Sequence, residues 1–221
     1  GIFPIHRKSI NSKSRRILKA GDSVKISFPK IKSDAKLVPV KMKLDIIFED
    51  DNLLVINKPA NLVVHPATRN RERTLVNALI NYYPKIANAT HNNSALSRSR
   101  PGIVHRLDKD TSGAIVIAKN RATLKFLSDQ FKNREVVKKY WALCYGWPKN
   151  THGKIISYLG RNPRKRLMIS DIGKEKGRVA ITKYKLLNHF TDNFGHKLSL
   201  IEFDIQTGRT HQIRTTARIL N

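Results

Sequence analysis

The chain has 221 residues, and its 43 lysines and arginines against 16 aspartates and glutamates give a formal charge of +27. This length suffices for one catalytic domain with a small appendage. The positive excess is larger than a solvated surface needs and favours binding to a polyanion such as RNA, DNA or an anionic membrane. Because no apolar run approaches membrane-spanning length and no signal-peptide pattern opens the chain, we expect a soluble protein of the cytoplasm.

The first segment along the chain, residues 1–43, holds 12 lysines and arginines and two acids, with little apolar periodicity. Within it, residues 18–26 resemble the end of an S4-type RNA-binding module, in which a Gly-Asp turn leads into a final strand. A basic, partly disordered arm is the alternative, and either segment would add phosphate contacts. We therefore expect a basic, partial S4-like N-terminal segment over 1–43 and the main domain over 44–221.

From residue 44 onward the pattern mixes helix and strand. Short runs rich in β-branched and aromatic residues predict strands at 53–56, 115–118, 140–145, 179–187 and 198–205. Apolar residues at helical spacing predict helices over 74–83, behind a Thr74 cap, and over 121–134. Residues 88–100 lack any period and predict a mobile basic loop. The elements together indicate an α+β fold with a large, mixed, mostly antiparallel sheet.

The most informative stretch runs from Gly102 to Gly113 and ends in His-Arg-Leu-Asp-Lys-Asp-Thr-Ser-Gly. It places the carboxylate of Asp108 two residues after Arg106, just before a Thr-Ser-Gly turn and a predicted strand. A reactive group presented where a tight turn meets a strand is held still. Because a lone aspartate in a loop is usually a turn former or a helix cap, a functional assignment needs supporting residues elsewhere.

That stretch resembles the motif His-Arg-Leu-Asp-x-x-Thr-Ser-Gly of the RluA family of pseudouridine synthases, with no mismatch at its defining positions. Further blocks match the same family in the same order, and they lie at 50–59 with a continuation at 62–66, at 138–142 and at 207–214. The first block and residues 160–166 look most like the RluD subgroup. The resemblance implies an α+β pseudouridine synthase catalytic domain that isomerises uridine to pseudouridine in RNA.

The same resemblance implies three catalytic residues. Asp108 matches the essential carboxylate, which can attack the base, attack the sugar carbon or remove a sugar proton, and these routes stay open. Tyr140 matches the active-site tyrosine, whose ring can stack on uracil and whose hydroxyl can serve acid–base steps. Arg214 matches the basic residue that pairs with the catalytic carboxylate and keeps it ionised, with a phosphate contact as the alternative.

A second group of residues is expected to bind RNA. Arg106 matches an arginine implicated in displacing the target nucleotide from a stem, a role that suits a planar guanidinium, and a phosphate contact is the alternative. Arg209 is a further candidate for RNA contact. An exposed basic loop is expected to grip the RNA backbone, unless it is only a solvated charge run, and it contains Arg161, Arg164, Lys165 and Arg166. Neither a phosphate-cradling glycine loop nor clustered His/Cys spacing occurs, so we expect no cofactor and no metal.

We expect the protein to act as a monomer on large-subunit ribosomal RNA, with transfer RNA as the nearest rival substrate. A non-catalytic RNA-binding or ribosome-assembly protein on the same fold would explain the charge equally well. It would not explain why Asp108, Tyr140 and Arg214 occur together. A DNA-binding protein has only the charge in its favour, because no helix-turn-helix or zinc signature occurs. The family continues beyond residue 221 into closing strands, so we expect the catalytic domain to be incomplete at its C-terminus.

Overall fold

The computed structural model describes residues 20–21, 37–66, 72–92, 95–165 and 168–220. The chain divides into two compact units, residues 1–36 and residues 37–221. Of the first unit only a turn at Ala20 and Gly21 is described, so the expected S4-like tail lies outside the described residues. None of the helices in the described ranges combines the length and the apolar character that a membrane crossing requires.

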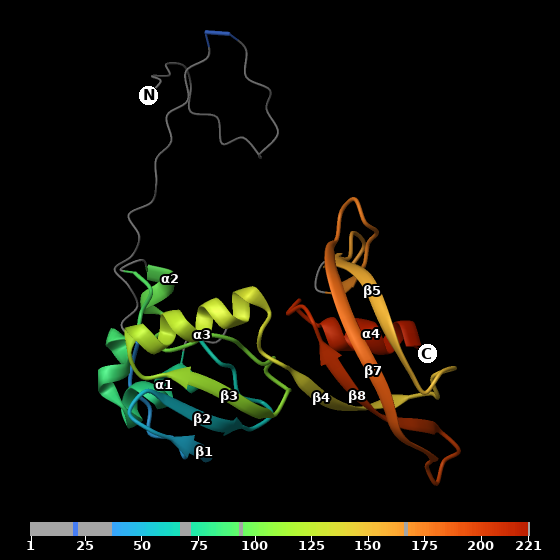
Figure 1. Ribbon diagram of the computed structural model, residues 1–221, viewed down its shortest axis with the longest axis horizontal. Coiled ribbons are helices and arrows are strands. Elements are labelled where there is room, and N and C mark those ends of the chain that lie inside the picture. Colours follow the sequence, from blue (N-terminus) through green and yellow to red (C-terminus); the bar gives the residue numbers. More distant parts are fainter. Residues whose placement is uncertain (1–19, 22–36, 67–71, 93–94, 166–167, 221) are drawn as a thin grey trace. The chain divides into compact units, whose positions relative to one another are not determined.

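The second unit opens on a three-stranded antiparallel sheet in the order β1-β2-β3 (Figure 1). Its strands are β1 (Ile46–Glu49), β2 (Leu53–Lys58) and β3 (Gly113–Ala118). Alternate residues of β2 and β3 face a core and are fully buried, namely Leu54, Ile56, Ile115 and Ile117. This period of two is what a sheet with one covered face requires.

Helical segments supply the other side of that core. They are α1 (Leu75–Tyr82), the 3-10 helix η1 (Pro84–Asn88), α2 (Ala95–Arg98) and α3 (Arg121–Asn133). The expected cap of α1 is confirmed, because the backbone N–H and the hydroxyl of Thr74 both donate to Asn77 Oδ1, at 3.0 and 2.6 Å. At the start of α3, Asn120 Oδ1 accepts the N–H of Thr123 at 2.9 Å. Leu75 and Leu79 of α1 are fully buried in the core.

A five-stranded antiparallel sheet in the order β4-β8-β7-β5-β6 follows. Its strands are β4 (Lys139–Tyr145), β5 (His152–Arg161), β6 (Ile169–Asp171), β7 (Arg178–Thr191) and β8 (Lys197–Ile205). Helix α4 (Gln212–Leu220) contacts β5, β6 and β7 and lies across one face of this sheet (Figure 1). Tyr184, Ile201 and Phe203 form its buried core, against which Ile213 and Ala217 of α4 pack.

All five predicted strands and both predicted helices are confirmed, within a few residues at their ends. The described strands form two sheets instead of the single large sheet that we expected. The sequence did not predict β5, because Gly153 and Gly160 weaken its strand pattern. A Cβ at Gly153 would lie 2.8 Å from the Tyr184 ring, so packing demands a glycine there. The predicted 88–100 loop contains the short helix α2.

Two glycines with positive φ allow a matched test of close packing. A Cβ at Gly102 (φ +71°) would lie 2.5 Å from the Ala118 carbonyl oxygen, whereas one at Gly173 (φ +83°) meets nothing within 4 Å. We expect Gly102→Ala to lower the free energy of unfolding by about 2–4 kcal/mol, and Gly173→Ala by about 1 kcal/mol from backbone strain alone. Urea denaturation followed by circular dichroism measures both, and equal losses would contradict the packing argument.

Candidate active site

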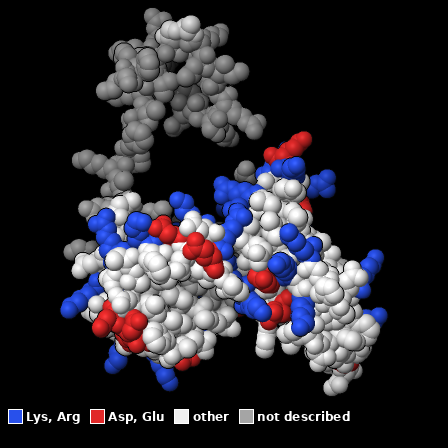
Figure 2. Space-filling model, in the orientation of Figure 1, with Lys and Arg blue, Asp and Glu red and all other residues white. Residues whose placement is uncertain are grey.

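A cleft of about 630 Å³ lies where three parts of the second unit converge. Its walls come from residues 104–111 before β3, from the stretch between the end of α3 and the start of β4, and from the loop joining β8 to α4. The lining has one carboxylate, Asp108, and six cationic side chains, namely Arg106, Lys132, Arg134, Lys138, Arg209 and Arg214. Lys and Arg also outnumber Asp and Glu on the face shown in Figure 2. The cleft therefore suits an anionic ligand.

Asp108 stands at the start of the turn that precedes β3. Its carbonyl accepts the N–H of Thr111 at 3.1 Å. Its carboxylate is 26% exposed, and Oδ2 lies 3.8 Å from Nε2 of His211 in the β8–α4 loop. His211 has a φ of +54°, a left-handed conformation that costs a non-glycine residue free energy and is found at functional sites. The turn and the loop thus bring a carboxylate and an imidazole together in the cleft.

A fully buried lysine holds this turn in place. Lys58, at the end of β2, donates from Nζ to the carbonyl oxygens of Pro59, Leu62 and Lys109, at 2.8, 2.9 and 3.1 Å. Burial lowers the pKa of the ammonium group, and the charges of Asp110 and Asp108 oppose that effect. Because Lys109 directly follows Asp108, these bonds fix the turn to the first sheet.

Tyr140 of β4 lines the same cleft and is half-buried. Burial raises the pKa of its phenol, and the negative charge of Asp108 raises it further. Both causes disfavour the phenolate. At neutral pH the hydroxyl is therefore a proton donor beside the carboxylate, on a ring that forms part of the cleft wall.

Arg214, in the first turn of α4, lines the cleft but does not make the expected ion pair. Its Nη2 lies 3.9 Å from Oδ2 of Asp110, while the side chain that lies near the Asp108 carboxylate is His211, whose Nε2 is 3.8 Å from Oδ2. The difference follows from exposure, because Asp110 is 63% exposed and Asp108 only 26%. A long side chain on the helix surface reaches the outer carboxylate first. An ion pair this open contributes little stability.

The loop that carries Arg209 and His211, and the first turn of α4 with Arg214, are anchored by one buried amide, that of Gln212. Its Oε1 accepts the Thr207 hydroxyl and the Arg209 N–H, both at 2.9 Å. Its Nε2 donates to the Ile181 carbonyl at 3.1 Å and to the Thr182 hydroxyl at 2.9 Å, both on β7. A buried network with every group bonded is rigid. The basic residues therefore project from a fixed support.

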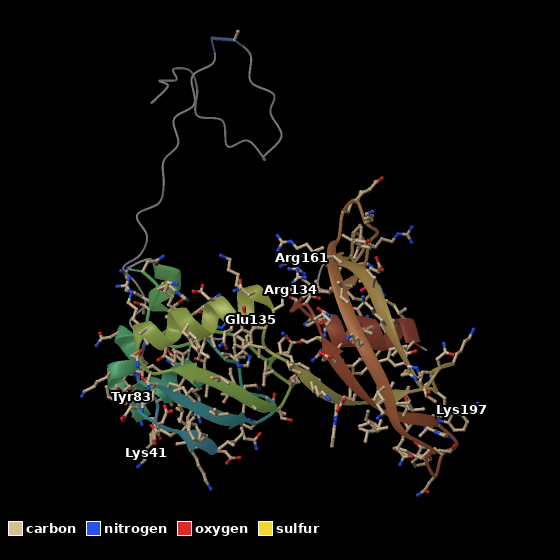
Figure 3. The ribbon with its side chains drawn as sticks, viewed as in Figure 1. Lys41, Tyr83, Arg134, Glu135, Arg161 and Lys197 are labelled. Atoms are coloured by element: carbon tan, nitrogen blue, oxygen red, sulfur yellow. The ribbon has the colours of Figure 1, made fainter. Side chains whose placement is uncertain are left out.

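The remaining predicted RNA-binding residues occupy different places. Arg209 lines the cleft, and its Nε donates to the Val179 carbonyl at 3.0 Å. Arg161 is exposed at the end of β5 (Figure 3). Arg164 and Lys165 are also exposed, and their backbone N–H groups donate to Asn162 Oδ1. As far as the structure describes the cleft lining, it includes none of these three exposed residues. Arg166 lies outside the described residues.

Arg106 is exposed and belongs to a group of positive side chains. Its charge adds to burial in lowering the pKa of Arg100, and it lowers the pKa of His65 after burial and Arg100. His65 Nδ1 and Arg100 Nε are buried, and neither has a hydrogen-bond partner among the described residues. Arg100 and Arg106 are cations that repel one another, and a nearby anion would relieve that repulsion.

His105 holds the segment before Asp108 between a helix and a strand. Its ring stacks on Phe131 of α3, with centroids 4.7 Å apart, and its Nε2 accepts the N–H of Val116 at 2.9 Å. Burial, with a smaller effect of Lys138, lowers the pKa of His105 to about 4. The ring is therefore neutral at pH 7.

No three His, Cys, Asp or Glu side chains within the described ranges are grouped as metal ligands.

Comparison with known proteins places this site in context. Residues 52–218 match the family model described as RNA pseudouridylate synthase. The chain is 40% identical over 203 residues to an uncharacterized RNA pseudouridine synthase of Synechocystis sp., covering 91% of this chain and 58% of the relative. It is 38% identical over 211 residues to ribosomal large subunit pseudouridine synthase D of Borreliella burgdorferi, covering 90% and 62% respectively. The chain thus spans about three fifths of these relatives.

Solved structures agree with the sequence matches. Human RNA pseudouridylate synthase domain containing 1 superimposes with a TM-score of 0.64 at 26% identity, over 80% of this chain and 65% of that one. Human RNA pseudouridylate synthase domain containing 4 gives 0.58 at 26% identity, over 79% and 64%. The likeness therefore extends from the motifs to the arrangement of helices and sheets.

The buried ammonium of Lys58 supplies a stability test. Lys58→Met leaves the carbonyls of Pro59, Leu62 and Lys109 without this donor, so we expect it to lower the free energy of unfolding by about 2–4 kcal/mol. The control Lys125→Met breaks the 2.6 Å exposed pair with Asp129 and should cost far less, because solvent screens an exposed pair. Urea denaturation compares the two. Similar losses would show that Lys58 does not secure the turn.

The neutral histidine supplies a pH test. The pKa of His105 is about 4 in the folded protein, against 6.5 for an unperturbed imidazole. Between these values the unfolded chain binds the extra proton, so the stabilisation present above pH 6.5 is lost as pH falls towards 4. We expect the urea midpoint to fall between pH 7 and pH 5, and to fall less in His105→Gln. An identical pH dependence in the two proteins would contradict this assignment.

Proposed function

The chain belongs to the RNA pseudouridylate synthase family, and from that premise we propose that it converts uridine to pseudouridine in a structured RNA, most specifically large-subunit ribosomal RNA. One observation carries the proposal: a cleft with a single carboxylate, that of Asp108, among six lysines and arginines, with Tyr140 in its wall. The cations suit an RNA backbone, and the carboxylate and the phenol supply the reactive groups.

The proposed reaction is an internal rearrangement. The bond from N1 of uracil to C1′ of the ribose breaks, the base turns, and C5 bonds to C1′. C5 loses a proton and N1 gains one, so the reaction needs no outside reagent. Asp108 takes part as an ionised carboxylate, by attack on the sugar, by attack on the base or by removal of a sugar proton. The positive side chains around the cleft compensate its charge.

Tyr140 and Arg214 complete the proposed catalytic group. The neutral phenol of Tyr140 can donate a proton to the departing or returning base, and its ring offers a face on which uracil stacks. Arg214 stands at the cleft wall with one exposed partner, Asp110, at 3.9 Å. An ion pair this weak exchanges readily, so a bound substrate allows the guanidinium to turn towards Asp108 or a phosphate.

RNA recognition falls to the cationic residues. A uridine inside a stem must leave the helix before it enters a cleft, and we assign its displacement to Arg106, which is exposed two residues before Asp108. The positive charge of Arg100, which interacts with that of Arg106, would favour a phosphate nearby. We propose that Arg209 contacts RNA at the cleft and that Arg161, Arg164, Lys165 and Arg166 contact the RNA backbone further out.

The choice of substrate follows the relatives. A ribosomal large subunit pseudouridine synthase D from Borreliella burgdorferi is 38% identical to this chain, and one from Yersinia pestis is 36% identical over 98% of the chain. We extend the substrate that their name states to this protein. The proposal also keeps the sequence-based expectations of a monomer, in the cytoplasm, that needs neither cofactor nor metal.

A substitution at the carboxylate tests the function. We expect Asp108→Asn to reduce pseudouridine formation by at least about 100-fold. RNA affinity should change little, because phosphate contacts dominate it. Asp110→Asn makes the same charge change in the same turn and should cost at most a few-fold. Carbodiimide labelling with primer extension, on unmodified large-subunit rRNA, measures the product, and fluorescence anisotropy measures affinity.

Other outcomes separate the alternatives. Modification of transfer RNA but not of ribosomal RNA would show that transfer RNA is the substrate. Tight RNA binding by the wild-type protein without product would instead favour the non-catalytic assembly protein. Full activity in Asp108→Asn would overturn the assignment of the carboxylate.

A further inference from the structure

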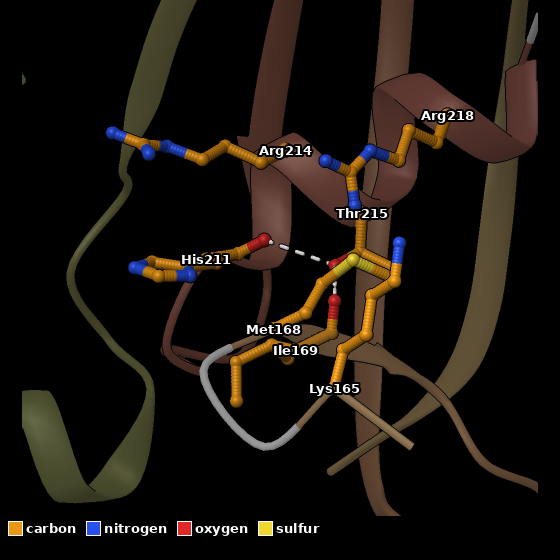
Figure 4. A pocket seen from close by; sticks show the side chains of 7 residues that line it. All are labelled: Lys165, Met168, Ile169, His211, Arg214, Thr215 and Arg218. Atoms are coloured by element: carbon orange, nitrogen blue, oxygen red, sulfur yellow. Dashed lines mark hydrogen bonds between the residues drawn. The ribbon is translucent and has the colours of Figure 1, made fainter. Parts of the chain in front are cut away.

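A second pocket, of about 520 Å³, opens beside the cleft and shares His211 and Arg214 with it (Figure 4). The pocket is formed by α4, by β6 and by the residues just before β6. Its lining consists of Lys165, Met168, Ile169, His211, Arg214, Thr215 and Arg218. The volume is within the range of roughly 300–1,000 Å³ that is usual for small-ligand sites. The chemistry assigned to the cleft makes no use of this pocket.

Its cations come from two directions. Arg214 and Arg218 are four residues apart on α4, and in Figure 4 Lys165 reaches towards Arg218 from the other side of the pocket, whereas the guanidinium of Arg214 extends away from both. Like charges at this helical spacing repel and weaken the isolated helix. None of the seven described lining residues is acidic. An anion in the pocket would relieve this repulsion.

Part of the remaining lining is apolar, and a hydrogen bond joins it to α4. Met168 and Ile169 form one wall, across from the arginines (Figure 4). The Thr215 hydroxyl contacts the Ile169 carbonyl at 3.4 Å and the His211 carbonyl at 3.2 Å, which ties α4 to β6. A cationic side facing an apolar side matches a nucleotide, which has a charged phosphate and a flat base or ribose.

We propose that this pocket binds the nucleotide adjacent to the target uridine in the same RNA strand. Arg218 and Lys165 hold its phosphodiester, with Arg214 on the side that the pocket shares with the cleft, while its base or ribose rests on Met168 and Ile169. His211 and Arg214 line both the cleft and the pocket. An RNA strand with its uridine in the cleft therefore passes over these two residues into the pocket. This inference rests on the proposed function and adds a subsite to it.

Single substitutions test the protein side of the contact. We expect Arg218→Gln and Lys165→Gln each to raise the Kd for RNA about 3- to 10-fold. Each should also reduce the slope of log Kd against log salt by about 1. Arg218→Lys should keep the salt slope. The matched control Lys41→Gln removes an exposed charge beside β1 (Figure 3) and should leave Kd and slope near wild type.

Uncharged linkages in the RNA test which phosphodiester of the strand occupies the pocket. Single methylphosphonates are placed one at a time along a short bound RNA, and each is measured with wild type, Arg218→Gln and Lys41→Gln. We expect one linkage, next to the modified uridine, at which neutralisation weakens wild type and Lys41→Gln but not Arg218→Gln. Additive effects at every linkage, or losses in Arg218→Gln no larger than in Lys41→Gln, would overturn the subsite.

Binding and turnover are measured separately, so the two proposals fail in different ways. If the wild-type protein binds RNA but forms no pseudouridine, the proposed function fails. The linkage scan then still decides whether Arg218 and Lys165 hold one phosphodiester. If pseudouridine forms normally and no linkage depends on Arg218, the function stands and the subsite is wrong.

Discussion

A buried ammonium group is the constraint on which this site depends. Lys58 is fully buried, and its charge is tolerable only because three carbonyl oxygens accept its hydrogen bonds. Two of these carbonyls follow β2, and the third belongs to Lys109, 51 residues further along the chain. Because the buried charge needs acceptors, the ammonium group holds these three carbonyls in fixed positions around it. It fixes the turn of Asp108 to the first sheet.

The other wall of the cleft is also fixed by hydrogen bonds, in this case those of a neutral amide. The Gln212 amide bonds to four groups, two within its own loop and two on β7, so the β8–α4 loop is fixed to the second sheet. One wall is held by a charged donor and the other by a neutral amide. His105 adds a third attachment through Phe131 and Val116. Reactive residues therefore stand on turns while their supports are buried.

The charged residues that line the cleft and the neighbouring pocket are mostly lysines and arginines. The buried polar groups of Lys58 and Gln212 have hydrogen-bond partners, whereas these lysines and arginines have few acidic partners. Arg214 shows the contrast, because it lines both hollows and its acidic contact, Asp110, is exposed. Like charges left unpaired reduce stability, and a polyanion recovers that loss on binding. The same arrangement that weakens the free protein therefore favours the binding of a polyanion.

Much of this could be read from the residues alone. Local patterns predicted the strands around Leu54, Ile115 and Ile201 and the cap at Thr74, because burial of alternate residues and capping depend on near neighbours. The motif around Asp108 also identified the residue on which the proposed chemistry depends, and the match of residues 52–218 confirms its family.

Contacts between distant segments were decided only by the tertiary structure. Gly153 lies in a strand because the Tyr184 ring packs against it, and no local pattern shows that contact. Arg214 contacts Asp110 where a pairing with Asp108 was expected, since the exposure of each carboxylate depends on how the turn is buried. The sequence by itself determined the kinds of residues and their local spacing. The fold decided which of them meet, because hydrogen bonds and charges act through space and not along the chain.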